Sequence, residues 1–203
     1  YVRRARCTVQ HAAAVIGDAD DGGPGVRRGP RHSELLGQVG SSAAYLFARL
    51  LAESDETLVV LAPDQGRAAQ FAAELDFYHG RPGEVFLFPH WEVRPYEPLS
   101  PHPEVESARL AALSALHDGR ARAVVLTPRA LLQRVIPREV LAGLREQLVT
   151  EEEYPRQALL ERLLELGYAS VPLVEDRGSF SARGDLLDIF PPTRSAPVRI
   201  EFF

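Results

Sequence analysis

Short apolar runs alternate with amphipathic segments through the middle of the chain. The runs lie at residues 58–62, 85–88 and 123–126, and their length and composition are typical of buried parallel strands. In the segments between them, apolar side chains recur every three or four residues, as from Ala68 to Leu75. Strand and helix in alternation predict a parallel sheet with helices on both faces.

The pattern changes after Arg145, where one helix is followed by several strands in close succession. Leucines at helical spacing precede Gly167, which predicts the end of this helix. The expected strands are at residues 170–174, 180–183, 186–190 and 198–203. The predicted fold class is therefore α/β: a degenerate P-loop-like parallel sheet with flanking helices, plus a smaller α+β domain with a mixed or antiparallel sheet.

These patterns divide the chain into three parts. Residues 1–31 contain a Gly- and Pro-rich stretch and no sustained periodicity, so we expect a disordered or non-native lead. Residues 32–145 are predicted to form the degenerate P-loop NTPase-like domain, and residues 146–203 the smaller domain. The chain begins with Tyr1 and contains no Met, which predicts a fragment.

The segment that enters the first amphipathic helix has the length and glycine start of a phosphate-binding loop. Such a loop needs a Lys that reaches the phosphates and a Ser or Thr that binds Mg²⁺. Gly37 is present, but the second glycine is replaced by Ser42, and the Lys and hydroxyl positions hold Ala43 and Ala44. By itself this segment is best explained as a helix start rich in small residues. If it descends from an ATPase, it predicts no nucleotide cofactor and no catalysis here.

Composition narrows the function classes further. The net charge is −5 and the pI about 5.7, which disfavours a broad electrostatic grip on DNA and favours a protein partner. The single cysteine, Cys7, excludes an intramolecular disulfide and suits a reducing compartment. No apolar run approaches the ~20 residues of a membrane span. We expect a cytoplasmic protein without a membrane segment.

Other polar groups have simpler explanations. His90 and His102 lack the ligand spacing of a metal site, so no metal is expected. Asp185 and Asp188 are interpreted as solvated turn and strand-edge carboxylates rather than a catalytic pair. The run at residues 151–153 is interpreted as the acidic first turn of a helix.

The final strand-like segment has two different faces. Its core face is predicted to carry Val198, Ile200 and Phe202. Its other face is predicted to carry Arg199, Glu201 and Phe203, where an aromatic ring among charges is unusual. Such a ring beside an arginine is typical of a binding hot spot, although Phe203 could equally be covered by a further strand.

Several strings occur together in a family-specific order. They are Leu35-Leu36-Gly37, Phe88-Pro89-His90-Trp91-Glu92, Pro95-Tyr96-Glu97-Pro98, Ser100-Pro101-His102-Pro103, Arg109-Leu110, Leu131-Leu132-Gln133-Arg134, Arg183-Gly184, Asp188-Ile189-Phe190-Pro191 and Arg199-Ile200-Glu201-Phe202-Phe203. From about Ser33 to Phe203 the chain resembles the N-terminal module of the bacterial transcription-repair coupling factor (Mfd) family, which is itself similar to UvrB. Intact UvrB keeps the phosphate-loop Lys, so Ala43 places the chain on the coupling-factor side.

The resemblance implies a module made of a degenerate nucleotide-binding-like half, an inserted second domain and a return to the first half. It implies that this chain stops inside the second domain. It further implies an adaptor that binds UvrA and recruits nucleotide excision repair to stalled RNA polymerase. Contacts of the parent with RNA polymerase and DNA, and its ATP-driven translocation, would lie in regions outside this chain.

The resemblance also implies a docking site. The family's UvrA contacts fall on Arg183, Arg199 and Phe203, where guanidinium groups would pair with UvrA carboxylates and the ring would supply apolar area. For Arg183 the alternative is a structural arginine that ties a strand end to a carboxylate. The rival function is the front part of a UvrB-like or helicase ATP-dependent repair enzyme that binds damaged DNA.

Overall fold

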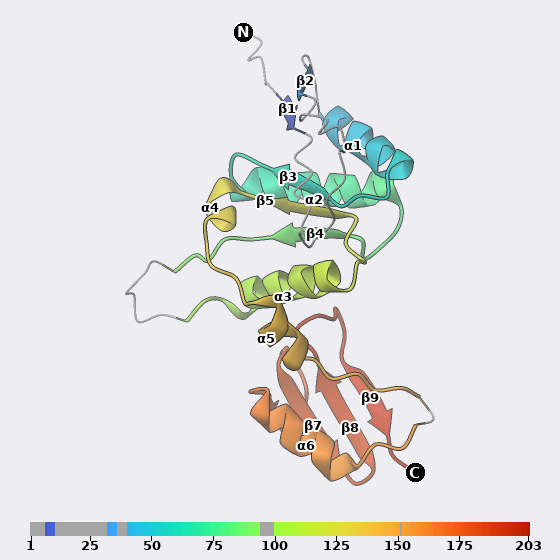
Figure 1. Cartoon of the computed structure of the whole chain (residues 1–203). Coiled ribbons are helices and arrows are strands. Elements are labelled where there is room, and N and C mark those ends of the chain that lie inside the picture. The colour runs from blue at the N-terminus through green and yellow to red at the C-terminus, as the bar shows by residue number, and fades with distance from the viewer. Residues whose placement is uncertain (1–6, 11–31, 36–39, 94–99, 151) are drawn as a thin grey trace, which may run out of the picture.

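The computed structural model describes residues 7–10, 32–35, 40–93, 100–150 and 152–203. Figure 1 shows two bodies of secondary structure, one around a parallel sheet and the other around a mixed sheet, with the short helix α5 (Arg138–Gly143) between them. The predicted α/β fold class, with a parallel sheet and a separate smaller sheet, is confirmed.

The first sheet contains three parallel strands. Their spatial order is β3 (Leu58–Leu61), β5 (Ala123–Leu126) and β4 (Val85–Phe88). All four residues of the central strand β5 are buried, which explains why it is a continuous apolar run. The three runs found in the sequence are these three strands.

Helices cover both faces of this sheet. α1 (Ser42–Glu53) and α2 (Gln65–His79) share one core cluster with Val60 and Val125, and α3 (Pro103–His117) packs on the other face. The Asp64 carboxylate caps α2 by accepting a hydrogen bond from the amide of Arg67 at 2.8 Å. A short helix, α4 (Pro128–Leu131), follows β5.

The second sheet has four strands packed against one helix. Its order is β6 (Ala169–Ser170), β7 (Ser179–Arg183), β8 (Leu186–Phe190) and β9 (Val198–Glu201). β6 and β7 are parallel, whereas β7, β8 and β9 form antiparallel pairs. α6 (Arg156–Glu165) buries Leu159 and Leu163 against this sheet, and the chain leaves the helix at Gly167 with a φ of 84°.

Two local expectations differ from the structure. The strand expected at residues 170–174 is only two residues long, because Pro172 has no amide hydrogen with which to continue the ladder. The helix α6 begins at Arg156, after Pro155, so Glu152 and Glu153 are not its first turn and that interpretation was wrong. Residue 151 lies outside the described residues.

The N-terminal part also contains a feature that periodicity did not predict. β1 (Cys7–Gln10) pairs antiparallel with β2 (His32–Leu35), so at least these four residues of the expected unstructured lead are a strand. The rest of residues 1–31 lies outside the described part. Among the helices that the structure describes, none is long and apolar enough to cross a membrane.

Candidate docking site on the second sheet

The strand register places charged side chains together on one face of the second sheet. Residues directly opposite in an antiparallel pair point to the same face, and the register aligns Ser181 with Asp188 and Asp188 with Arg199. It also aligns Arg183 with Leu186, and Leu186 with Glu201. We call this side, which carries Arg183, Leu186, Asp188, Arg199 and Glu201, the open face.

The opposite side of the same strands is the core. Phe180, Leu187 and Ile189 are buried there with Leu159 and Leu163 of α6. Ile200 and Phe202 pack against this cluster, so the predicted inward positions are confirmed for both residues. A one-residue shift of register would exchange the two faces, so burial of the core also fixes the open face.

Arg199 is held on the open face by a two-point contact. Its Nε donates to Oδ1 of Asp188 at 2.7 Å and its Nη2 donates to Oδ2 at 2.9 Å. The hydrogen bond from Arg199 lowers the pKa of Asp188 below its ordinary value, and the same bond raises the pKa of Arg199. The Arg199 side chain is still 59% exposed, so its outer edge faces solvent.

Arg183 lies at the end of β7 and is also exposed. Its Nη2 donates to the carbonyl oxygen of Pro172, which also accepts a hydrogen bond from Oγ of Ser181 at 3.1 Å. The predicted structural alternative for Arg183 named a carboxylate, whereas the partner here is a backbone carbonyl. The charge of Arg183 also contributes to the lowered pKa of Asp188, so the two arginines act on one carboxylate.

Phe203 follows β9 and its ring is fully exposed. The preceding residue is anchored, because the amide of Phe202 donates to the carbonyl of Asp185 at 2.9 Å and its ring packs against the core. The backbone is thus held one residue before Phe203, which itself lies two residues beyond the end of β9. All three residues predicted for docking lie on exposed positions of the same sheet or directly beside it.

The segment predicted to be a degenerate nucleotide loop is only partly described. Gly37 lies outside the described residues, whereas Ser42 and Ala43 begin α1, and Ala44 is fully buried in the core. A phosphate loop joins a strand of the parallel sheet to a helix. The strand before α1 is β2, which pairs with β1 in a separate two-stranded sheet.

Comparisons with known proteins identify the region that carries the open face. The family model described as the UvrB interaction domain matches residues 147–203, which include β6 to β9. The transcription-repair-coupling factor of Myxococcus xanthus is 40% identical over 173 residues, 82% of this chain and 14% of the relative. That of Escherichia coli is 31% identical over 170 residues, 83% of this chain and 15% of the relative.

The chain matches a fragment of the transcription-repair-coupling factors. It is also similar to UvrABC system protein B of Thermus thermophilus, with 33% identity over 192 residues, 88% of this chain and 28% of the relative. The chain thus spans about one seventh of the length of the coupling factors and less than a third of the UvrB protein.

Three of the strings that suggested this family meet at Arg109 of α3. The Arg109 guanidinium lies 4.2 Å from the centre of the Phe88 ring and 4.4 Å from that of Trp91. Its Nη1 donates to the carbonyl of Pro89 at 2.7 Å and to Oε1 of Gln133 at 3.4 Å. Gln133 Oε1 in turn accepts from the amide of Trp91 at 2.8 Å. The family-specific residues here hold two loops at the carboxyl ends of β4 and β5.

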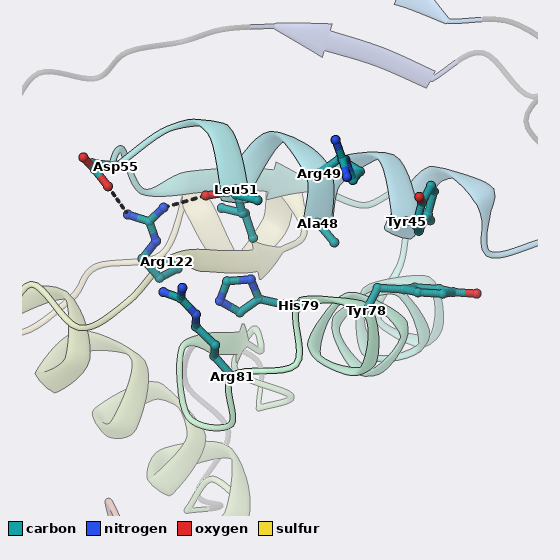
Figure 2. A pocket seen from close by; sticks show the side chains of 10 residues that line it. Tyr45, Ala48, Arg49, Leu51, Asp55, Tyr78, His79, Arg81 and Arg122 are labelled. Atoms are coloured by element: carbon teal, nitrogen blue, oxygen red, sulfur yellow. Dashed lines mark hydrogen bonds and ion pairs between the residues drawn. The ribbon is translucent and has the colours of Figure 1, made fainter.

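A hollow of about 330 Å³ lies at the opposite ends of the strands, between α1 and α2 (Figure 2). Arg122, just before β5, donates to the carbonyl of Leu51 at 2.7 Å and to that of Ser54, and it lies 3.8 Å from Asp55. Its guanidinium therefore satisfies carbonyls at the end of α1. Arg49, also on the lining, pairs with Glu53 at 3.6 Å.

His79, which also lines the hollow, contacts an acidic side chain beside it. Glu84 Oε2 lies 2.7 Å from Nε2 of His79, and this hydrogen bond, together with the charges of Arg81 and Arg122, lowers the pKa of Glu84. Arg49, Arg122 and His79, which line the hollow, thus each contact a carboxylate of the chain. The arrangement suits a polar seam between helix ends better than a site for an anionic ligand.

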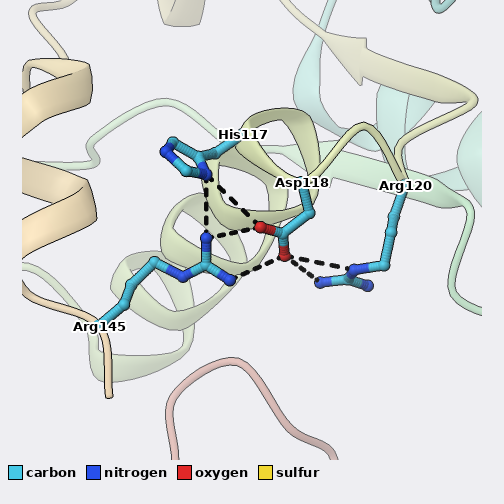
Figure 3. Close-up of polar contacts among 4 residues, drawn as sticks. All are labelled: His117, Asp118, Arg120 and Arg145. Carbon is cyan, nitrogen blue, oxygen red and sulfur yellow. Dashed lines mark hydrogen bonds and ion pairs between the residues drawn. The ribbon is translucent and has the colours of Figure 1, made fainter. Parts of the chain in front are cut away.

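A cluster of polar side chains lies where α3 approaches the segment before α6 (Figure 3). Asp118 accepts two hydrogen bonds from Arg145, Nη1 to Oδ1 at 2.5 Å and Nη2 to Oδ2 at 2.9 Å, and two longer ones from Arg120. The bond from Arg145 is the largest cause of a lowered pKa at Asp118. On the other side, Arg162 of α6 donates to the carbonyl of Gly143 at 2.5 Å. The segment between the two sheets is therefore held from both directions.

Two contacts at these sites were not predicted from the sequence. Asp188 was interpreted as a solvated carboxylate, but it is the partner of Arg199 on the open face. Counting outward positions on two strands joined by the turn at Pro191-Pro192 could have suggested this pair. Arg109 was recognised only as part of a string, because its neighbours at residues 88–91 and 133–134 are distant in sequence.

Proposed function

We propose that this chain is a UvrA-binding adaptor, and that Arg183 and Arg199 on the open face, together with Phe203 just beyond β9, are its contact residues. The observation that carries the proposal is the exposure of two arginines, Arg183 and Arg199, on one face of the sheet in a region that matches the UvrB interaction domain. In this role the module would recruit nucleotide excision repair to stalled RNA polymerase in the cytoplasm.

The chemistry of these side chains supports protein recognition. Arginine and aromatic residues are enriched in binding hot spots, because a guanidinium combines several donors with a planar surface and a ring buries much area. Arg199 uses two donor atoms on Asp188, which leaves Nη1 for a carboxylate of the partner. Phe203 would contribute apolar area beside these polar contacts.

We further propose that residues 32–145 and 146–203 are two domains with different tasks. The second would dock UvrA, and the first would be a nucleotide-binding-like fold without nucleotide chemistry, since Ala43 and Ala44 replace the phosphate-binding Lys and the Mg²⁺-binding hydroxyl. Translocation on DNA, and contacts with RNA polymerase and DNA, would be properties of other regions of a full-length coupling factor.

The docking proposal is tested with immobilised UvrA and the purified 203-residue chain, by interferometry and thermal melting. Arg199→Ala, Arg183→Ala and Phe203→Ala should each weaken binding about tenfold or more without a change in melting temperature. Arg194→Ala is the matched control, because Arg194 is an exposed arginine in the turn between β8 and β9. Unchanged binding of Arg199→Ala, or equal weakening of the control, would reject the site.

The second candidate is the front part of a UvrB-like ATP-dependent repair enzyme that binds damaged DNA. It is favoured by the 33% identity to a UvrABC system protein B over 88% of the chain. The two candidates differ in ligand. An enzyme of this type should bind ATP with Mg²⁺ in calorimetry and should shift a damaged duplex in a salt-dependent manner, whereas the adaptor should do neither and should bind UvrA.

A further inference from the structure

The Arg199–Asp188 contact links two strands at directly opposed positions. Asp188 lies on β8 and Arg199 on β9, and the two residues are partners in the register. Both oxygens of Asp188 are used, one by Nε and one by Nη2 of Arg199. A carboxylate that meets one edge of a guanidinium with both oxygens fixes the plane and direction of the whole group.

This geometry divides the guanidinium into two edges. The edge formed by Nε and one hydrogen of Nη2 faces Asp188, and the remaining hydrogens on Nη1 and Nη2 are directed away from it. Arg199 is mostly exposed whereas Asp188 is only 24% exposed, so the carboxylate lies closer to the sheet and the guanidinium lies closer to solvent. Two other charged residues on this face act on the pair: Arg183 on Asp188, and Glu201 on Arg199.

We infer that Asp188 is a positioning residue for the docking site: it holds the Arg199 guanidinium with its outer edge ready for a carboxylate of the partner protein. This inference rests on the proposed function. An arginine side chain that is already ordered loses less rotamer freedom on binding than one that moves freely. Asp188 therefore raises affinity without forming a contact of its own with the partner.

Loss of Asp188 could also strengthen binding for a different physical reason, and this makes the inference testable. Removal of an acidic group makes the surface more positive, and simple electrostatics then predicts tighter binding of an acidic partner. The same would follow if Asp188 competed with the partner for Arg199. Positioning predicts weaker binding after the loss of Asp188, so the sign of the change separates these effects.

The experiment is a double-mutant cycle in the full chain, measured by interferometry on UvrA and by thermal melting. Asp188→Ala should weaken UvrA binding about fivefold. In the Arg199→Ala background, the same substitution should have no further effect, since the group to be positioned is absent. Asp188→Asn should recover part of the affinity, because its amide oxygen still accepts one hydrogen bond from Arg199.

Asp185→Ala is the matched control. Asp185 lies in the turn between β7 and β8 and carries the same charge near the same face, so its removal reports the electrostatic effect alone. Unchanged or tighter binding of Asp188→Ala overturns the inference, as does equal weakening in the presence and absence of Arg199. If Arg199→Ala itself binds UvrA normally, the proposed docking site fails, which is a different result from failure of the positioning role.

Discussion

Arg145 meets Asp118 edge to edge, with both terminal guanidinium nitrogens on the two carboxylate oxygens at 2.5 and 2.9 Å. Asp118 ends α3 beneath the parallel sheet, and Arg145 lies in the segment that leads to α6. The Tyr154 hydroxyl and Arg162 both contact Glu146, one residue beyond Arg145. The segment between the two sheets is thus tied to α3 on one side and to the region of α6 on the other.

We predict that Asp118→Asn lowers stability and that its effect depends on pH. Arg145 holds the pKa of the folded Asp118 carboxyl below its ordinary value of 3.8. A depressed folded pKa contributes stability above the unfolded pKa, and this contribution is lost as pH falls through the folded value. The cost at pH 7 should be about 0.5–1 kcal/mol, since Asp118 is partly exposed and screened.

The measurement is a series of melting curves for the parent and Asp118→Asn between pH 7 and pH 3. The difference in melting temperature should shrink below about pH 4, where the unfolded carboxyl becomes protonated. Arg145→Ala should behave like Asp118→Asn at pH 7, while Arg138→Ala, on the exposed side of α5, serves as its control. A difference that is constant with pH would contradict the ion-pair explanation.

The buried guanidinium of Arg109 provides a second prediction. Arg109 is 2% exposed and its pKa is lowered by burial. Arg109→Ala should destabilise the chain by about 2–4 kcal/mol, since it removes two ring contacts and leaves the Pro89 carbonyl without its donor.

Arg109→Lys keeps the charge but should recover less than half of that loss, because an ammonium cannot stack between the Phe88 and Trp91 rings as a planar guanidinium does. Urea unfolding gives both free energies. Trp91 is the only tryptophan, so its fluorescence reports the same site. Full recovery by Lys would show that charge alone, rather than stacking, stabilises this contact.

Two adjacent leucines test the assignment of faces on the second sheet. Leu187 is completely buried, while Leu186, its neighbour on β8, lies on the open face with 36% of its surface exposed. Leu187→Ala should cost about 3 kcal/mol of unfolding free energy. Leu186→Ala should cost less than about 1 kcal/mol and should weaken UvrA binding instead, since Leu186 lies opposite Arg183. Equal destabilisation by both would contradict the register.

Nucleotide binding is the last test. We predict no ATP affinity in the millimolar range or tighter, with or without Mg²⁺, because no lysine or hydroxyl occupies the required positions at Ala43 and Ala44. Ala43→Lys should not restore hydrolysis. The next position, where a phosphate loop carries the Mg²⁺-binding hydroxyl, would still be Ala44, whose methyl group is packed in the core. Calorimetry measures binding, and phosphate release measures hydrolysis. Clear binding by the parent chain would favour the UvrB-like alternative.

Local sequence determined the elements of this fold. A buried parallel strand is a continuous apolar run, as in β5, and an amphipathic helix repeats every three to four residues, as in α2, because both patterns follow from backbone geometry alone. The alternating faces of β9 could be predicted for the same reason. Helix ends at Gly80 and Gly167 follow from the left-handed backbone that glycine adopts.

Tertiary structure decided which side chains meet. Arg199 needs Asp188 eleven residues earlier, and that meeting depends on the register across a turn that periodicity does not specify. Arg109 contacts residues in both 88–91 and 133–134, because parallel strands bring the segments that follow them to one edge of the sheet. Periodicity reports only whether a position faces inward or outward, whereas hydrogen bonds between distant segments require the packed fold to bring donor and acceptor within 3 Å.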